Sequence, residues 1–174
     1  MGCQKQHMTT QMIPLGVSPG GALRVASHQR LAWLCQSEKC LASLLAKPHR
    51  LRKRFGSDVT TSEKLGLDVQ AWHESRIKRL IQQAHRDGRV LSGQNKTILG
   101  LDHLTVVLLA QDIGTQTVTL NSDAINSVTT YSLPFTSRQI GDLLGKGPRS
   151  LLGIRPGRGT QSLIDGLRRW PSLG

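Results

Sequence analysis

Residues 105–110, Thr-Val-Val-Leu-Leu-Ala, contain the longest apolar run of the chain and indicate the fold class of its C-terminal part. The run has the length of a β-strand and is far too short to cross a membrane. Its apolar residues are continuous rather than alternating, which predicts burial on both faces, as in a sheet between two layers of helices.

An amphipathic helix is predicted upstream of this strand, over residues 68–86. Asp68 is a suitable N-cap, and Gly88 stands where a left-handed C-cap is needed. Ser92-Gly93 predicts a short turn into a second helix over 94–99. The apolar face of the first helix is expected to hold Val69, Trp72, Ile77, Leu80, Ile81 and Ala84, and its polar face His73, Arg76, Arg79, Gln83 and Arg86.

Helical and strand patterns also alternate downstream. Residues 118–120, 129–133 and 150–154 have strand character, whereas 140–144 and 161–170 are predicted helices. Thr136-Ser137 followed by Gln139 has the spacing of a capping box before the helix at 140. This alternation predicts an α/β fold in which residues 68–174 form a three-layer α/β/α sandwich.

The first 56 residues are predicted to form a separate small α+β module, joined by a polar linker over 57–67. Strands are expected at 12–17, 23–25 and 31–35, with the first two joined by the Ser18-Pro19-Gly20-Gly21 turn. Ser37 is positioned to cap a following helix, and Pro48 is expected to end or bend it. The densest basic run of the chain, residues 49–55, comes next.

The charge of the chain favours a polyanionic partner. Lys and Arg number 23 against 11 Asp and Glu, a formal net charge of +12 over 174 residues. Such an excess is typical of proteins that bind nucleic acid phosphates. Aromatic residues make up only 3% of the sequence, which disfavours a stacking platform for single-stranded bases.

Several other classes of protein are disfavoured. No recognised catalytic spacing of Ser, His, Lys or acidic residues occurs, so we expect no enzyme and no cofactor. No secretory signal is seen, and the three cysteines fit a reducing cytoplasm. Cys3, His7, Cys35 and Cys40 have the ligand types of a zinc site, but their spacings are wider than usual; simple burial of the thiols is the alternative, and no metal is assigned.

Four segments of the C-terminal part resemble, in order, signatures of the bacterial members of the kink-turn-binding ribosomal-protein superfamily. Residues 84–93 (AHRDGRVLSG) resemble "ARRAGKLVSG", and residues 106–112 (VVLLAQD) resemble "LVLLAxD". Residues 134–141 (PFTSRQIG) are similar to "PFTREELG", and residues 144–149 (LGKGPR) to "LGxGPR". The N-terminal part resembles, in a degenerate form, the YlxR family.

That second resemblance covers roughly residues 3–56. The turn SPGG at 18–21 is similar to the "GPDG" turn of that family, RLAWLC at 30–35 to "GRGAWVC", SEKCL at 37–41 to "SRECL", and the basic run ending in Arg54-Phe55 to "KRLARAF". The two resemblances imply RNA binding by both parts of the chain, in bacterial transcription, translation or RNA processing. Structured RNA, such as ribosomal or ribonuclease P RNA, is the implied partner.

The superfamily's RNA-contacting loop reads "GxNExxK", and this chain retains Gly93 and Asn95 of it. Lys96 stands at the Glu position and Leu99 at the Lys position, so phosphate contact is expected here without a guanine-binding carboxylate. A turn without any ligand is the alternative for Ser92-Gly93. For residues 145–149 the alternative is a helix C-cap followed by a proline stop, and for the basic run it is a solvated helix end.

The residues predicted to contact RNA are mainly cations and small residues in three segments. They are Arg50, Arg52, Lys53 and Arg54 in the basic run; Arg86, Arg89, Ser92, Gly93, Asn95 and Lys96 around the predicted loop; and Gly145, Lys146, Gly147 and Arg149. Two other functions remain open on sequence alone: a protein-interaction module with a basic surface, and a zinc-binding or thiol-based regulator. The oligomeric state cannot be inferred.

Overall fold

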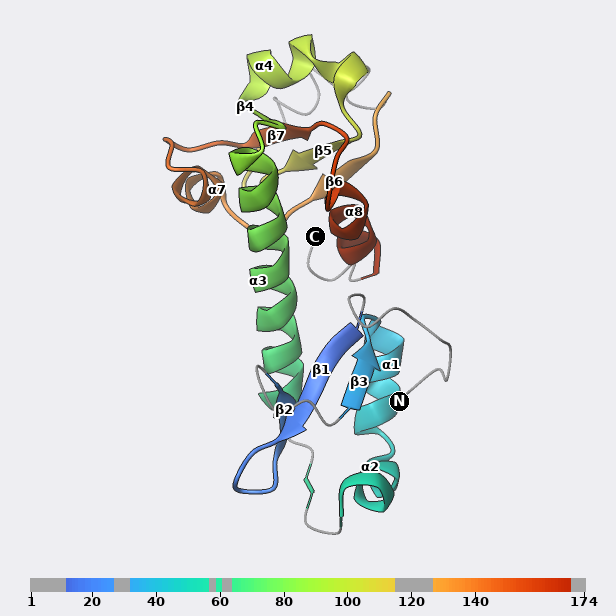
Figure 1. The fold of residues 1–174 in the computed structure, drawn as a ribbon. Coiled ribbons are helices and arrows are strands. Elements are labelled where there is room, and N and C mark those ends of the chain that lie inside the picture. The colour runs from blue at the N-terminus through green and yellow to red at the C-terminus, as the bar shows by residue number, and fades with distance from the viewer. Residues whose placement is uncertain (1–11, 27–31, 57–58, 61–63, 115–126, 170–174) are drawn as a thin grey trace. The chain divides into compact units, whose positions relative to one another are not determined.

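The computed structural model describes residues 12–26, 32–56, 59–60, 64–114 and 127–169 (Figure 1). The predicted strand at 118–120 and the residues Cys3 and His7 lie outside these ranges. The chain divides into two compact units, residues 1–75 and 76–174. Each unit combines helices with a β-sheet, which confirms the predicted α/β class.

The N-terminal unit is built on a three-stranded antiparallel sheet of order β2-β1-β3. Its strands are β1 (Met12–Val17), β2 (Leu23–Val25) and β3 (Ala32–Cys35), at the predicted positions. The Ser18 carbonyl accepts the Gly21 N–H at 2.9 Å, and Gly21 has φ +79°. This is the left-handed conformation that a glycine in the turn was expected to supply.

Two helices follow β3. In α1 (Glu38–Leu45), the residues Cys40, Leu41 and Leu44 are buried, and Ser37 occupies the N-cap without a side-chain capping bond. Pro48 does more than end this helix, because it opens a second one, α2 (Pro48–Phe55), that contains the whole basic run. A proline suits the first helical turn, where its missing N–H has no partner to lose.

The predicted linker over 57–67 is wrong in two respects. Val59 is buried and Thr60 forms an isolated parallel bridge with Ala22, so these two residues belong to the N-terminal unit. The long helix α3 (Lys64–Arg86) then begins before Asp68. Asp68 is therefore not an N-cap; its carboxylate instead pairs with the guanidinium of Arg24 from β2.

The buried stripe of α3 also differs from the prediction, since Trp72 and Leu80 are only half-buried. Leu65, Val69, His73, Ile77 and Ile81 are buried at spacings of four residues. His73, expected on the polar face, is 0% exposed, and its ring packs edge-on against Trp72 with centroids 5.2 Å apart. Residues spaced by four lie on one side of a helix. The position of His73 in this series therefore decides its burial, although its side chain is polar.

The C-terminal unit contains a four-stranded mixed sheet of order β4-β7-β5-β6. Its strands are β4 (Val90–Ser92), β5 (Val106–Leu109), β6 (Thr130–Ser132) and β7 (Leu151–Ile154). β5 pairs in parallel with β6 and antiparallel with β7. Most of β5 is buried, as its continuous apolar run predicted, and all of β7 is buried as well. Strand β4 was not predicted.

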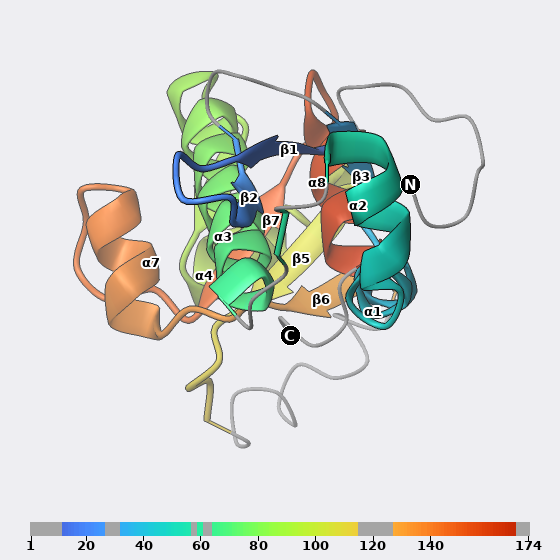
Figure 2. The same cartoon turned by 90° about the horizontal axis from the view of Figure 1, so that it is seen from below.

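Helices cover both faces of this sheet. Figures 1 and 2 show α4 (Gln94–Leu99) on one face, and the C-terminal part of α3 with α8 (Thr160–Arg169) on the other. A Cβ on Gly153 of β7 would stand 2.3 Å from Leu104, next to the short helix η2 (Leu101–His103), so the α4 face packs tightly. No described helix is long and apolar enough to cross a membrane.

Candidate functional site

The turn between β4 and α4 is held by main-chain contacts. Gly93 occupies the N-cap of α4 with φ +99°, a conformation that favours glycine. Its N–H donates to the carbonyl of Leu151 at 3.0 Å, and its own carbonyl accepts the N–H of Thr97 at 3.1 Å. The turn is thus fixed to the central strand β7, and Asn95 and Lys96 remain exposed on α4.

The second motif, residues 145–149, follows α7 (Ser137–Leu143). Gly145 has φ +64°. Its N–H donates to the main-chain carbonyl of Asp142 at 3.2 Å, and the Lys146 N–H donates to the main-chain carbonyl of Gly141 at 2.9 Å. This pair of bonds is a Schellman motif, followed by Pro148. The helix C-cap considered from the sequence is therefore present, and it leaves the Lys146 side chain exposed.

Two features of α7 fix the position of this loop. At its start, Thr136 and Gln139 form the predicted capping box, and Asp112 accepts hydrogen bonds from the hydroxyl and the N–H of Ser137 at 2.7 and 2.6 Å. These bonds lower the pKa of Asp112. Near its end, Gly141 lies so close to the loop that a Cβ there would stand 2.4 Å from the carbonyl oxygen of Gly147.

The structure brings the two motifs together, although Lys146 follows Ser92 by 54 positions in the sequence. The Lys146 ammonium donates to the Ser92 hydroxyl at 3.2 Å. A Cβ on Gly93 would lie 4.0 Å from Cδ of Arg149. We call the surface formed by residues 92–96 and 145–149 the loop site.

Arg149 keeps unused donors at the loop site. Its guanidinium donates to the carbonyl of Pro148 at 2.9 Å, while Nε is buried without a hydrogen-bond partner among the described residues. The two terminal nitrogens of a guanidinium carry four N–H groups, and the bond to Pro148 uses one of them. Arg149, Lys96 and Lys146 give the site three cations, and both of its backbone segments contain glycine.

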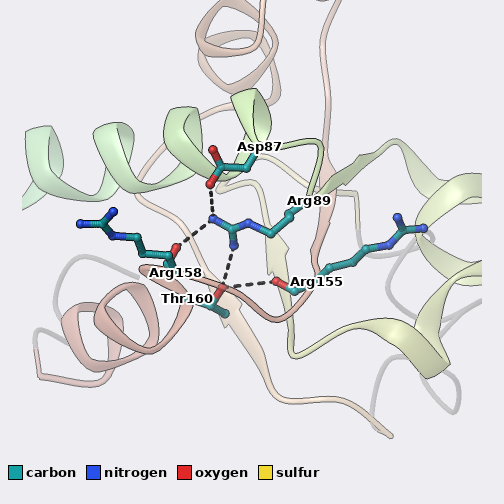
Figure 3. Close-up of polar contacts among 5 residues, drawn as sticks. All are labelled: Asp87, Arg89, Arg155, Arg158 and Thr160. Carbon is teal, nitrogen blue, oxygen red and sulfur yellow. Dashed lines mark hydrogen bonds and ion pairs between the residues drawn. The ribbon is translucent and has the colours of Figure 1, made fainter.

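Arg89 takes a structural position instead. Its guanidinium donates to Asp87 at 2.7 Å, to the Arg158 carbonyl at 2.8 Å and to the Thr160 hydroxyl at 3.0 Å. Figure 3 shows this network tying the end of α3 to the loop before α8, while the guanidinium groups of Arg155 and Arg158 point away from it. We therefore no longer include Arg89 among the residues expected to contact RNA.

The other predicted cations lie elsewhere. Arg52 and Lys53 are exposed on α2 of the N-terminal unit, and the side chains of Arg50 and Arg54 lie outside the described residues. Arg86 is exposed at the end of α3, where it lines a groove that the sequence did not predict. Cys35 and Cys40 are buried, and no group of three or more metal-ligating side chains occurs within the described ranges.

Comparisons with known proteins add little to this picture. No protein-family model and no curated protein matches the chain. A solved structure of a Bacillus halodurans protein of unknown function is similar at 20% identity and a TM-score of 0.48, over 53% of this chain and 96% of that one. The Giardia lamblia 15.5 kD RNA binding protein is similar at 12% identity and a TM-score of 0.48, over 59% of this chain and 90% of that one. With scores this low, function has to be inferred from the residues of this chain.

Proposed function

We propose that this protein binds structured RNA and that the loop site contacts the phosphate backbone. The observation that carries the proposal is the meeting of Lys146 with Ser92, which joins two predicted phosphate-contacting segments into one surface. The net charge of +12 supports a polyanionic partner. Glycines at 93, 145 and 147 let a ligand approach the main chain closely.

The biological setting is part of the same proposal. We propose an accessory role in the transcription, translation or RNA processing of a bacterial cytoplasm, with ribosomal or ribonuclease P RNA as the partner to test first. The protein would act by recognition rather than catalysis, a role that the exposed cations and donors of the loop site would serve.

The first experiment is to purify the full chain without nuclease and to sequence the RNA that accompanies it, with a nuclease-treated sample as the control. Enrichment of one structured RNA would support the proposal and identify the target. Protein that is free of nucleic acid, and that does not bind structured RNA at about 150 mM salt, would contradict it and favour a protein-interaction module.

A matched pair of variants tests the loop site itself. Lys96→Gln with Lys146→Gln should weaken the binding of structured RNA regardless of its sequence, because phosphate contacts carry no sequence information. Lys39→Gln with Lys47→Gln removes the same charge from two other exposed positions and should leave affinity nearly unchanged. Equal losses from both pairs would show that only the overall charge matters.

A further inference from the structure

A groove of about 430 Å³ lies between α3 and α8 in the C-terminal unit. None of its lining residues belongs to the loop site. The groove is partly open to solvent, and all but one of its lining residues come from α3, while Ser162 comes from α8. Its lining residues are Arg76, Arg79, Leu80, Gln82, Gln83, Arg86 and Ser162.

The charge in the groove is of one sign. Three of the lining residues are arginines, and no lining residue is acidic. Residues three or four apart are neighbours on a helix surface, and neither Arg79 nor Arg86 has a carboxylate at such a spacing. An anion held in the groove would neutralise the charge of these two arginines.

The spacing of the arginines along α3 favours an extended anion over a small one. A helix rises 1.5 Å per residue, so the arginines from 76 to 86 span about 15 Å. In double-stranded DNA one strand carries a charge about every 3.4 Å of helix axis. The groove is long compared with such a spacing, which suits consecutive backbone phosphates better than one small anion. Guanidinium groups bind phosphate oxygens in a fork, and the Gln82 and Gln83 amides and the Ser162 hydroxyl add donors.

We propose that this groove binds a second segment of RNA backbone, through Arg79 and Arg86. The inference rests on the proposed function and extends it. The groove is lined by residues of α3 and α8, and Figures 1 and 2 show these helices on one face of the sheet and α4 on the other. The groove and the α4 part of the loop site would therefore contact different parts of the RNA.

The test compares three pairs of substitutions in the full chain. Arg79→Gln with Arg86→Gln empties the groove of two cations, Lys96→Gln with Lys146→Gln alters the loop site, and Lys39→Gln with Lys47→Gln is the charge-matched control. The probe is fluorescein-labelled transfer RNA, a structured RNA, and its anisotropy gives the affinity across a series of salt concentrations. Circular dichroism checks that each variant is folded.

The groove pair is expected to weaken binding by about tenfold and to reduce the slope of log affinity against log salt by roughly 1.4 to 1.8, which corresponds to two lost phosphate contacts. Arg79→Lys with Arg86→Lys should keep most of the slope, because the charges remain. The control pair should change neither quantity by a comparable amount.

The outcomes separate this inference from the proposed function. If the loop-site pair lowers RNA affinity and the groove pair does not, the groove inference is wrong and the loop site is supported. If only the groove pair lowers RNA affinity, the groove inference is supported and the loop site is contradicted. A groove effect no larger than that of the control pair, or a wild-type chain that does not bind the probe, would overturn the inference.

Discussion

Gly141 shows how one missing side chain positions a functional loop. Replacing glycine by alanine inside a helix ordinarily stabilises it by up to about 1 kcal/mol. At Gly141, however, the new methyl group would meet the backbone carbonyls of Lys146 and Gly147 at 2.8 and 2.4 Å. Because these are main-chain atoms of a capped turn, they cannot rotate aside, and the overlap outweighs the gain in propensity.

We therefore expect Gly141→Ala to lower the free energy of unfolding by about 1–3 kcal/mol, the usual range for overpacking. RNA affinity should fall as well, since the loop site would be displaced. Gly166→Ala in α8 is the control, because a Cβ there meets nothing within 4 Å. Urea unfolding measures both variants, and an equal or higher stability of Gly141→Ala would show that the loop adapts.

Arg89 leads to a second prediction at this scale. Its side chain is 15% exposed and makes three hydrogen bonds that join the end of α3 to the loop before α8. Arg89→Ala should lower the free energy of unfolding by about 2 kcal/mol, since hydrogen bonds to a charged group contribute more than neutral ones. Arg158→Ala removes an exposed guanidinium but keeps the carbonyl that Arg89 needs, so thermal unfolding of this control should be nearly unchanged.

Asp112 gives a prediction about pH. The hydrogen bonds from Ser137 lower the pKa of the Asp112 carboxyl below its ordinary value of about 3.9. A group whose pKa is lowered by folding stabilises the native state above its unfolded pKa, and that contribution is lost as pH falls through the folded pKa.

Titration of the Asp112 carboxyl by NMR should therefore give a midpoint below about 3.9. Asp112→Asn should reduce the loss of stability between about pH 5 and pH 2, because no proton is taken up at this position on unfolding. A midpoint at or above the ordinary value would mean that the bonds to Ser137 do not persist in solution.

At the scale of elements, the parts that sequence predicted well are those with local signals. The bounds of β1, β2 and α4 agree with the prediction, and the capping box at Thr136 formed as its spacing indicated. Each depends on residues within a few positions of one another. A turn, a cap or a short apolar run carries this information without knowledge of the rest of the fold.

The elements that were missed depend on distant partners. β4 has only three residues, too few to show a period, and it exists because Val90 and Leu91 pair with Ile154 and Gly153 of β7. The start of α3 was placed too late because Lys64 lies in a polar segment. His73 was placed on the wrong face because residue type was weighed above its four-residue spacing from Val69 and Ile77.

The two segments of the candidate loop site were identified from the sequence, but their meeting was not predicted. The motifs at 92–96 and 145–149 were identified separately, and nothing local showed that Lys146 would reach Ser92. The packing of Gly141 on the loop and the internal bonds of Arg89 are likewise tertiary facts. The arginine groove was overlooked because one of its lining residues comes from α8, far along the chain.

Helix α2 carries a prediction of its own. Leu51 is fully buried, whereas Arg52 and Lys53 are exposed, so the helix is anchored by an apolar residue and presents cations to solvent. Arg52→Gln with Lys53→Gln should reduce the slope of log RNA affinity against log salt by up to about 1.8 if both contact phosphates. Unchanged binding at about 150 mM salt would limit α2 to a structural role.

At the scale of the whole molecule, the positive charge is spread over both compact units, and the loop site and α2 belong to different ones. The remaining question is whether the two units bind the same RNA at the same time. If they do, each unit holds the RNA close to the other, and the linked sites bind far more tightly than either one alone.

A double-mutant cycle in the full chain tests whether both units bind the same RNA. Lys96→Gln with Lys146→Gln, and Arg52→Gln with Lys53→Gln, are made separately and together. The salt slope counts phosphate contacts, so if both units contact one RNA, the reductions in slope should sum in the variant that carries all four substitutions. Either pair alone should also weaken binding substantially, because it removes one arm of a linked contact. A four-fold variant no weaker than the Lys96 and Lys146 pair would show that the N-terminal unit does not touch this RNA, and would leave its basic helix for another partner.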